Sequence, residues 1–348
     1  MSDDQRIEYS DNQEFNDEFD SENPEIKIGN LTPYKASQIL YSVDYEAYLL
    51  AIEEQKQKKI DEQKESVYYE YPQPIAYYFH QAENGYSNEN HRLQLLRSTW
   101  EAIIFTIYAI VIGEARNKSF PFRNIVGLDS NDNPDLSFND YFSDKLAQKL
   151  LIIERILKYS VDNHIPLVSN QLIPLAVIQK VRRLNQERNG FMHTAALSEE
   201  QASRKYLELV PDVLDVLTDL NELASLEILH YIGNEGAATA LRFHLFQGYT
   251  LARQNSPTMQ ITPTQLSRIA GELTNQNIFA YYQGELFSIT PFLHFKSEAN
   301  GNITNLCYCK KKHSNTRYEL EIVTHSEVYE DDGTVFTDRI NELRGLII

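Results

Sequence analysis

The sequence is poor in cysteine, in long apolar runs and in basic charge, and each shortage narrows the class of protein. Cys307 and Cys309 are its two cysteines, which excludes a disulfide scaffold and is typical of a reducing compartment. The longest apolar run, residues 102–113, is shorter than the roughly 20 residues that span a bilayer, so we expect a buried core helix. The N-terminus has no basic segment followed by an apolar stretch, and we expect no secretory signal. We therefore predict a cytoplasmic protein without a membrane partner.

Basic residues and glycine-rich loops are also scarce. The 50 acidic side chains outnumber the 32 basic ones, and the formal net charge is -18. This charge repels nucleic acid over most of the surface, so nucleic-acid binding requires a local basic pocket. Because no glycine-rich phosphate loop is present, we expect no nucleotide hydrolysis and no cofactor. The 348 residues are enough for two or three domains.

Changes in composition divide the chain into four predicted parts. Residues 1–30 are acidic and without periodicity, as in a disordered tail. Residues 31–90 are predicted to form a helical extension, with a helix over 31–66, followed by an aromatic, proline-containing connector. Residues 91–232 form one helical block, interrupted by a polar loop, and predict a bundle. In residues 233–348 aromatic and β-branched residues alternate with polar ones, which predicts a smaller α+β domain with an antiparallel sheet.

Four amphipathic helices are predicted in the bundle. The first contains the long apolar run, and the second begins near Ser143, a favourable N-cap residue. The third begins near Asn170, with Pro174 in its first turn. The fourth begins at Ser198, and Pro211 is expected to kink or break it.

The stretch QERNGFMHTA, residues 186–195, places three chemically active side chains at the end of the third helix. Asn189 and His193 are four residues apart and so share a helical face, and the long side chain of Arg188 can reach the same patch. The preceding run, QKVRRLNQERN, is basic within an acidic protein. It is therefore a place where a phosphate could be held.

These residue types suit cleavage of RNA without a metal ion. A histidine can remove the proton of a 2′-hydroxyl near neutral pH. An arginine can offset the negative charge that develops on the phosphate in the transition state. An asparagine can orient the histidine or bind a phosphate oxygen. Such a reaction leaves a 2′,3′-cyclic phosphate.

The segment RNGFMH, residues 188–193, resembles the Arg-polar-x-x-x-His signature of HEPN domains, helical bundles that are frequently metal-independent ribonucleases. The resemblance covers roughly residues 90–230. It implies a mainly α protein with a HEPN-like bundle, in which Arg188 stabilises the phosphate, His193 is the general base or acid, and Asn189 orients it. It also implies a homodimer, because two protomers of that family bring their motifs together in one cleft.

The wider layout is similar to effectors of bacterial anti-phage defence and toxin systems. This similarity implies an RNA substrate and a regulatory, antitoxin or sensor protein that keeps the effector silent. One alternative is a non-catalytic HEPN-like module that dimerises and binds RNA or a partner protein. Another is a purely structural role, with Arg188 as an exposed cation at a helix C-terminus and His193 as a surface or core histidine.

Weaker patterns carry less specific predictions. Residues 129–140, DSNDNPDLSFND, lack the sixth-position glycine and the final glutamate of a calcium loop, so we expect a polar loop. The two cysteines lack zinc-site spacing and are predicted to alternate along a strand. The run CKKKH, residues 309–313, is a basic patch that could touch RNA or end a solvated hairpin. Arg97 and Glu101 are candidate supporting partners of the motif.

Overall fold

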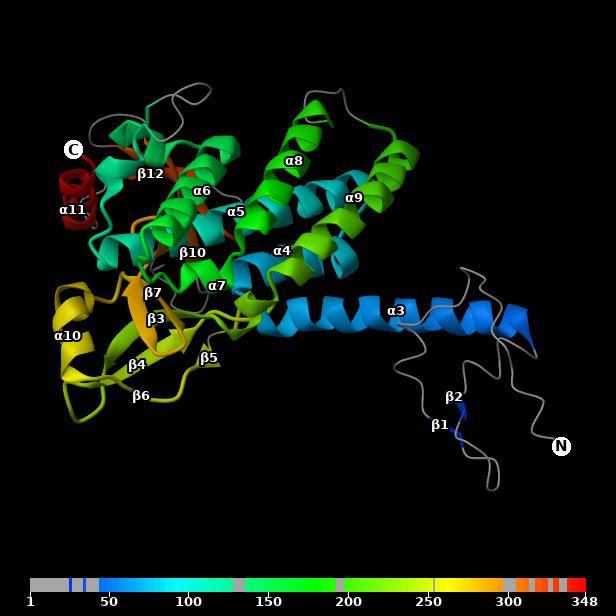
Figure 1. The fold of residues 1–348 in the computed structure, drawn as a ribbon, viewed down its shortest axis with the longest axis horizontal. Helices are drawn as coiled ribbons and strands as arrows, with labels where there is room; N and C mark the ends of the chain where they lie inside the picture. The colour runs from blue at the N-terminus through cyan, green and yellow to red at the C-terminus, as the bar shows by residue number, and fades with distance from the viewer. Residues whose placement is uncertain are drawn as a thin grey trace. The chain divides into compact units, whose positions relative to one another are not determined.

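A computed structural model shows a mainly helical protein with an antiparallel sheet region towards its C-terminus (Figure 1). The ranges that it describes are 25–26, 34–35, 44–127, 135–191, 197–252, 254–296, 305–312, 317–324, 328–331 and 337–348. By its contacts the chain divides into two compact units, Met1–Glu65 and Ser66–Ile348. The four-part division expected from composition stays a prediction.

The first unit contains a short strand pair and most of a long helix. Strand β1 (Glu25–Ile26) pairs antiparallel with β2 (Tyr34–Lys35), and the remainder of the predicted acidic tail lies outside the described residues. Helix α3 (Tyr45–Glu70) begins later than the predicted start at residue 31. Asp44 explains this start, because its carboxylate accepts the backbone N–H of Ala47 at 3.0 Å and so caps the first turn.

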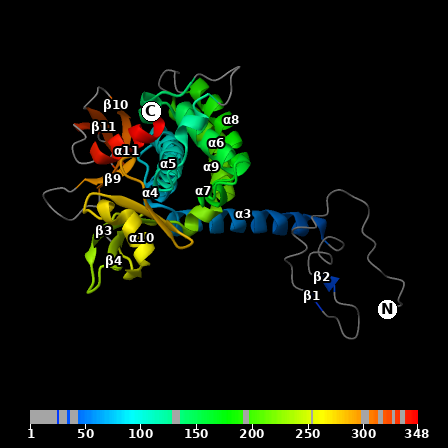
Figure 2. The same cartoon turned by 60° about the vertical axis from the view of Figure 1, so that its left-hand side comes forward.

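The second unit begins with helices packed around α5. They are listed here in chain order: α4 (Gln73–Asn84), α5 (Glu89–Asn117), α6 (Leu146–Asp162), α7 (Ser169–Leu172), α8 (Leu175–Phe191) and α9 (Glu199–Asp219). Figure 2 looks close to the axis of α5, with α6, α8 and α9 on one side of it and the strands on the other. Helix α5 contacts α4, α6 and α9 directly, and α8 packs on α6 and α9.

Helix α5 is the core helix expected from the long apolar run. All side chains of residues 102–113 are buried, mostly completely. Of the described helices, only α5 is long and apolar enough to cross a membrane, but 83% of its most apolar window is buried inside the protein. Its apolar residues are thus accounted for by packing against the surrounding helices and strands.

Three predictions about the bundle helices are corrected: the start of the second helix, the continuity of the third, and a break at Pro211 in the fourth. Helix α6 begins at Leu146 rather than near Ser143, whose hydroxyl accepts the N–H of Lys145 instead of capping the helix. The predicted third helix is two helices, α7 and α8, because Pro174 lacks an N–H group and disfavours helical backbone at Ile173. Pro211 does not break α9, which continues through it.

The predicted aromatic connector contains a buried helix, α4, which the two prolines seemed to exclude. Pro72 occupies the N-cap position and Pro74 lies in the first turn, where a missing N–H group breaks no helical hydrogen bond. Ile75 and Phe79 are fully buried. The start of α9 follows the prediction, since Ser198 caps it and exchanges side-chain hydrogen bonds with Gln201 in a capping box.

Two antiparallel sheets follow, and the first begins at Glu227, ahead of the predicted boundary at residue 233. The first sheet has the order β5-β4-β3-β7-β8, with β6 also pairing with β4. Its strands are β3 (Glu227–Asn234), β4 (Ala240–Leu245), β5 (Gln254–Asn255), β6 (Met259–Gln260), β7 (Ile278–Tyr282) and β8 (Glu285–Ser288). The second sheet has the order β12-β11-β10-β9, formed by β9 (Leu293–Lys296), β10 (Asn305–Lys312), β11 (Tyr318–Ile322) and β12 (Val328–Asp331).

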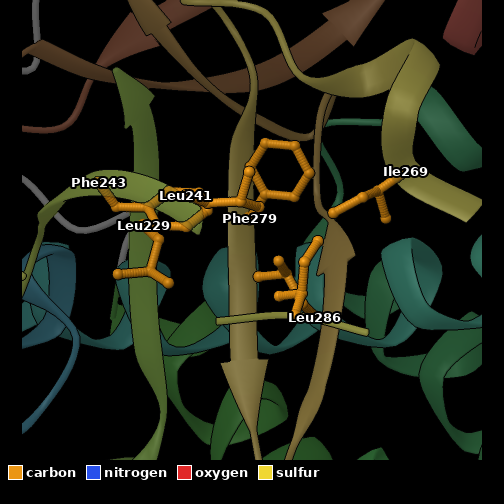
Figure 3. Close-up of a cluster of buried hydrophobic side chains, with 7 residues drawn as sticks. Leu229, Leu241, Phe243, Ile269, Phe279 and Leu286 are labelled. Atoms are coloured by element: carbon orange, nitrogen blue, oxygen red, sulfur yellow. The ribbon is translucent and has the colours of Figure 1, made fainter. Parts of the chain in front are cut away.

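Short helices accompany these sheets. They are η1 (Phe122–Ile125), η2 (Phe138–Phe142), η3 (Asn221–Ser225), α10 (Pro263–Ile269), η4 (Ala270–Glu272) and the C-terminal helix α11 (Thr337–Ile347). Among them, η2 contacts β10 while α10 contacts β8. The first sheet has its own apolar core, which Figure 3 shows between the strands and α10. Its buried members are Leu229, Leu241, Phe243, Ile261, Ile269, Phe279 and Leu286.

The helices and the sheets meet at the C-terminal end of α5. Gly113 allows the closest approach, because a Cβ atom there would lie 2.7 Å from the carbonyl oxygen of Ser288. One turn later the fully buried Arg116 donates to both carboxylate oxygens of Glu272, the nearer at 2.8 Å, and to Glu342 at 2.7 Å. Arg116 also donates to the carbonyl of Ser288 at 3.2 Å. A buried ion-pair network therefore joins α5 to η4 and α11.

Candidate active site at the end of helix α8

Helix α8 carries the predicted motif, and its start is held by α5. The buried carboxylate of Glu114 accepts the backbone N–H groups of Val168 and Ser169 at 2.7 and 2.9 Å, and the Ser169 hydroxyl at 2.6 Å. These bonds fix α7, which is separated from α8 by only two residues. Beyond them, the fully buried Ile178 and Val181 turn one face of α8 towards the core.

The motif itself is described only in part. Arg188 and Asn189 belong to the last turn of α8, which ends at Phe191. Their side chains lie outside what the structure describes, and so does the whole of His193. The predicted meeting of these three side chains in one pocket is therefore a prediction still.

The far side of the motif is anchored by α9. The carboxylate of Glu199 accepts the backbone N–H of Glu89 and the side-chain amide of Asn90, each at 2.7 Å. Asn90 also donates to the carbonyl of Leu197 at 3.2 Å. The hydrogen bond from Asn90, followed by that from Glu89, lowers the pKa of Glu199. Two attachments to α5 therefore flank the motif in sequence. Before it, α7 is bound near the C-terminal end of α5, and after it, α9 is bound at the N-terminal end of α5.

The basic neighbourhood predicted around the motif is largely neutralised by ion pairs. Lys180 forms ion pairs with Asp215 and Asp219 of α9. Burial by itself would lower the pKa of Lys180, but its hydrogen bonds to these two carboxylates raise it. Arg182 forms an ion pair with Glu154 of α6. Among the described residues, these pairs leave less positive charge for a phosphate than the sequence run suggested.

Arg183 is the exception in this run. Its side chain is exposed and forms no ion pair with a described residue. It lies on α8 five residues before Arg188 and is therefore a suitable comparison residue for experiments on the motif. Arg97 and Glu101, the suggested supporting partners, form an ion pair with each other at 2.9 Å on α5.

The weaker patterns give no site within the described residues. Residues 129–134 of the rejected calcium loop lie outside them, and Asp140 accepts the N–H of Ser137 at 2.7 Å. Both cysteines are buried on β10, as the predicted strand alternation requires, while His313 lies outside the described part. In that part no three histidine, cysteine, aspartate or glutamate side chains are grouped so as to hold a metal ion.

One buried titratable side chain was missed by the sequence reasoning. Lys149 of α6 is fully buried, and its ammonium nitrogen has no hydrogen-bond partner among the residues that the structure describes. It lies 4.7 Å from the ring centre of Phe105 and 4.3 Å from that of Tyr108. Burial lowers the pKa of Lys149 to about 8. Its position between Leu146 and Ile153, in phase with the apolar face of α6, was the available signal.

Comparisons with protein-family models, with curated proteins and with solved structures found no match. The fold and the described part of the site therefore define a mainly helical protein with a C-terminal antiparallel sheet region. The HEPN resemblance depends on the motif residues and their helical context.

Proposed function

We propose that this protein is a homodimeric, metal-independent endoribonuclease of the HEPN type. The observation that carries the proposal is the position of the motif. Arg188 and Asn189 occupy the last turn of a packed helix, and His193 follows just before the capped start of α9. In the proposed reaction His193 takes the proton of a 2′-hydroxyl, and the 2′-oxygen attacks the adjacent phosphorus. The 5′-oxygen of the next nucleotide leaves and takes up the proton that protonated His193 gives back, and Arg188 stabilises the charged phosphate.

The test is cleavage of tRNA and total RNA by the purified protein in the presence of EDTA. We expect cleavage by the natural protein and by Arg183→Ala, which removes a neighbouring exposed cation of the same helix. We expect Arg188→Ala and His193→Ala to lose cleavage by at least about 100-fold, the usual contribution of a general acid–base residue. Equal cleavage by all four proteins would identify another site or a contaminating nuclease.

We further propose that the enzyme acts as a toxin or anti-phage effector that a partner protein keeps silent. A free ribonuclease harms its host, so the natural protein should slow growth and express poorly. His193→Ala should express well at unchanged growth rate. Comparable growth and yield for the two proteins would contradict toxicity while leaving the cleavage experiment unaffected.

A non-catalytic module that dimerises and binds a partner is the second candidate. The ion pairs of Lys180 and Arg182 favour it, because they reduce the positive charge available next to the motif. This candidate predicts a dimer in sedimentation analysis and no cleavage of any RNA. The enzyme predicts that dimerisation and cleavage occur together.

A further inference from the structure

Among the described residues, two of the three lysines on β10 form ion pairs and the third has no carboxylate partner. Lys310 forms an ion pair with Glu321 on the neighbouring strand. Lys311 forms ion pairs with Glu319 at 3.2 Å and Asp144 at 3.7 Å. Lys312, in contrast, has no carboxylate partner among the described residues.

A second cation shares the surroundings of Lys312. The ammonium nitrogen of Lys312 lies 5.2 Å from the ring centre of Phe138, and the guanidinium carbon of Arg344 lies 4.8 Å from the same ring centre. Lys312 also donates to the side-chain oxygen of Asn139 at 3.3 Å. Phe138 is only 8% exposed, so the two cations lie around a largely covered aromatic ring.

Arg344 likewise has no carboxylate partner within the described residues, although acidic side chains outnumber basic ones in this chain. Two like charges held around one ring repel each other. Burial, followed by the charge of Arg344, lowers the pKa of Lys312. An anion bound between the two cations would offset this repulsion.

A third cation extends the group. Arg123 of η1 is exposed and donates to the backbone carbonyl of Gly345, the residue after Arg344, at 3.4 Å. The three cations come from η1, β10 and α11, which are distant in sequence. A group of cations from three segments suits a ligand with repeated negative charges, and the covered ring of Phe138 offers little surface for a base to stack on.

We propose that Lys312 and Arg344, extended by Arg123, form a second RNA-binding site that holds phosphates of the RNA backbone without reading its sequence. This site is separate from the motif of α8 and rests on the proposed function for its choice of ligand. Its role is to hold the RNA chain while the motif cleaves it.

The test uses the full chain with His193→Ala, so that bound RNA stays intact, and a fluorescent single-stranded RNA followed by anisotropy at several salt concentrations. A lost phosphate contact lowers the slope of log affinity against log salt by about 0.7, which is about fivefold in affinity at about 0.1 M salt. We expect this loss for Lys312→Gln and again for Arg344→Gln. Lys310→Gln is the matched control, because Glu321 already neutralises that lysine, and it should change affinity less than about twofold.

Unchanged affinity and unchanged salt slope in the double variant would overturn the proposal. So would RNA binding that is too weak to detect in the parent protein. If inorganic phosphate raises the melting temperature of the parent but not of the double variant, while RNA affinity is equal, the site takes small anions and the RNA assignment is wrong. Should the double variant fail to fold, the exposed Arg123→Gln gives the same readout. The motif is tested separately by cleavage, so loss of cleavage with retained binding overturns only the nuclease.

Discussion

Two buried cations on neighbouring helices are stabilised in different ways. Arg116, at the end of α5, is 1% exposed and hydrogen-bonds to two carboxylates and a carbonyl. Lys149, on α6, is equally buried but faces the rings of Phe105 and Tyr108, and in the described part of the chain its nitrogen has no hydrogen-bond partner. The charge of Arg116 is stabilised by carboxylates, whereas the ammonium group of Lys149 is surrounded by aromatic rings.

The pKa values show what this difference means for folding. Burial alone would lower the pKa of Arg116, but the carboxylates of Glu272 and Glu342 raise it, so the charge is retained at all accessible pH values. For Lys149 burial dominates, and the charges of Cys309 and Asp144, which act to raise the pKa, do not prevent its lowering. Arg116 therefore joins parts of the molecule together, whereas charged Lys149 costs stability.

The largest expected effect comes from removing the paired cation. Arg116→Gln leaves Glu272 buried without its main partner, and such changes destabilise a protein by about 3–5 kcal/mol. Urea unfolding monitored by circular dichroism measures the loss. Arg97→Gln, which breaks an exposed ion pair on the same helix, should cost less than about 1 kcal/mol. An equal loss of unfolding free energy in the two variants would mean that the buried network stabilises the protein no more than an exposed ion pair does.

The second effect has the opposite sign. Lys149→Met replaces the unpaired cation by an apolar side chain, and we expect the variant to be more stable at pH 7 by about 3 kcal/mol, from the lowering of the pKa from 10.5 to about 8. Below pH 8 Lys149 is protonated in both the folded and the unfolded natural protein, so the folded state bears the full free-energy cost of burying the charge. Between pH 8 and 10.5 Lys149 is deprotonated in the folded state but still protonated in the unfolded state. The stability of the natural protein therefore rises with pH towards that of the variant.

Urea unfolding at pH 7, 8, 9 and 10 checks this prediction. Burial raises the pKa of Tyr108 well above 10, so this ring neighbour of Lys149 does not titrate between pH 7 and 10. A constant difference across the range would show that Lys149 does not titrate as its burial requires. A destabilised variant would show that the aromatic faces compensate fully for burial.

The smallest effect concerns the contact that places Arg116. In Gly113→Ala the new Cβ would meet the Ser288 carbonyl at 2.7 Å and Cα of Ile289 at 3.0 Å, so α5 must move away from the strand. Overpacking of this kind costs about 1–3 kcal/mol. Gly345→Ala on α11 is the control, because its Cβ meets nothing within 4 Å, and should stabilise by about 0.5–1 kcal/mol. A neutral Gly113→Ala would disprove the tight approach.

Much of the helical half could be predicted because its signals are local. The run 102–113 and the cap at Ser198 depend on residues close in sequence, and both predictions are confirmed. The buried helix α4 was missed because Pro72 and Pro74 were interpreted as breaking a helix rather than starting one. Helix α11 was missed because it follows a strand-rich region and its burial depends on contacts with distant segments.

The candidate site was less accessible to sequence reasoning. The position of Arg188 and Asn189 at the end of a bundle helix could be predicted from helical periodicity. The ion pairs of Lys180 and Arg182 could not, because their acidic partners lie on α9 and α6. The proximity of Lys312 and Arg344 to Phe138 could not be predicted either. The three residues lie on β10, α11 and η2, which no local sequence pattern connects.

The attachments of α5 have one more consequence. Glu114 fixes the beginning of α7, and through it α8, while Glu89 and Asn90 fix the beginning of α9. The two helices that border the motif are thus both attached to α5, α8 through α7 and α9 directly. A substitution deep in α5, which touches no motif residue, would therefore change the geometry available to the motif by tilting or shifting this common support.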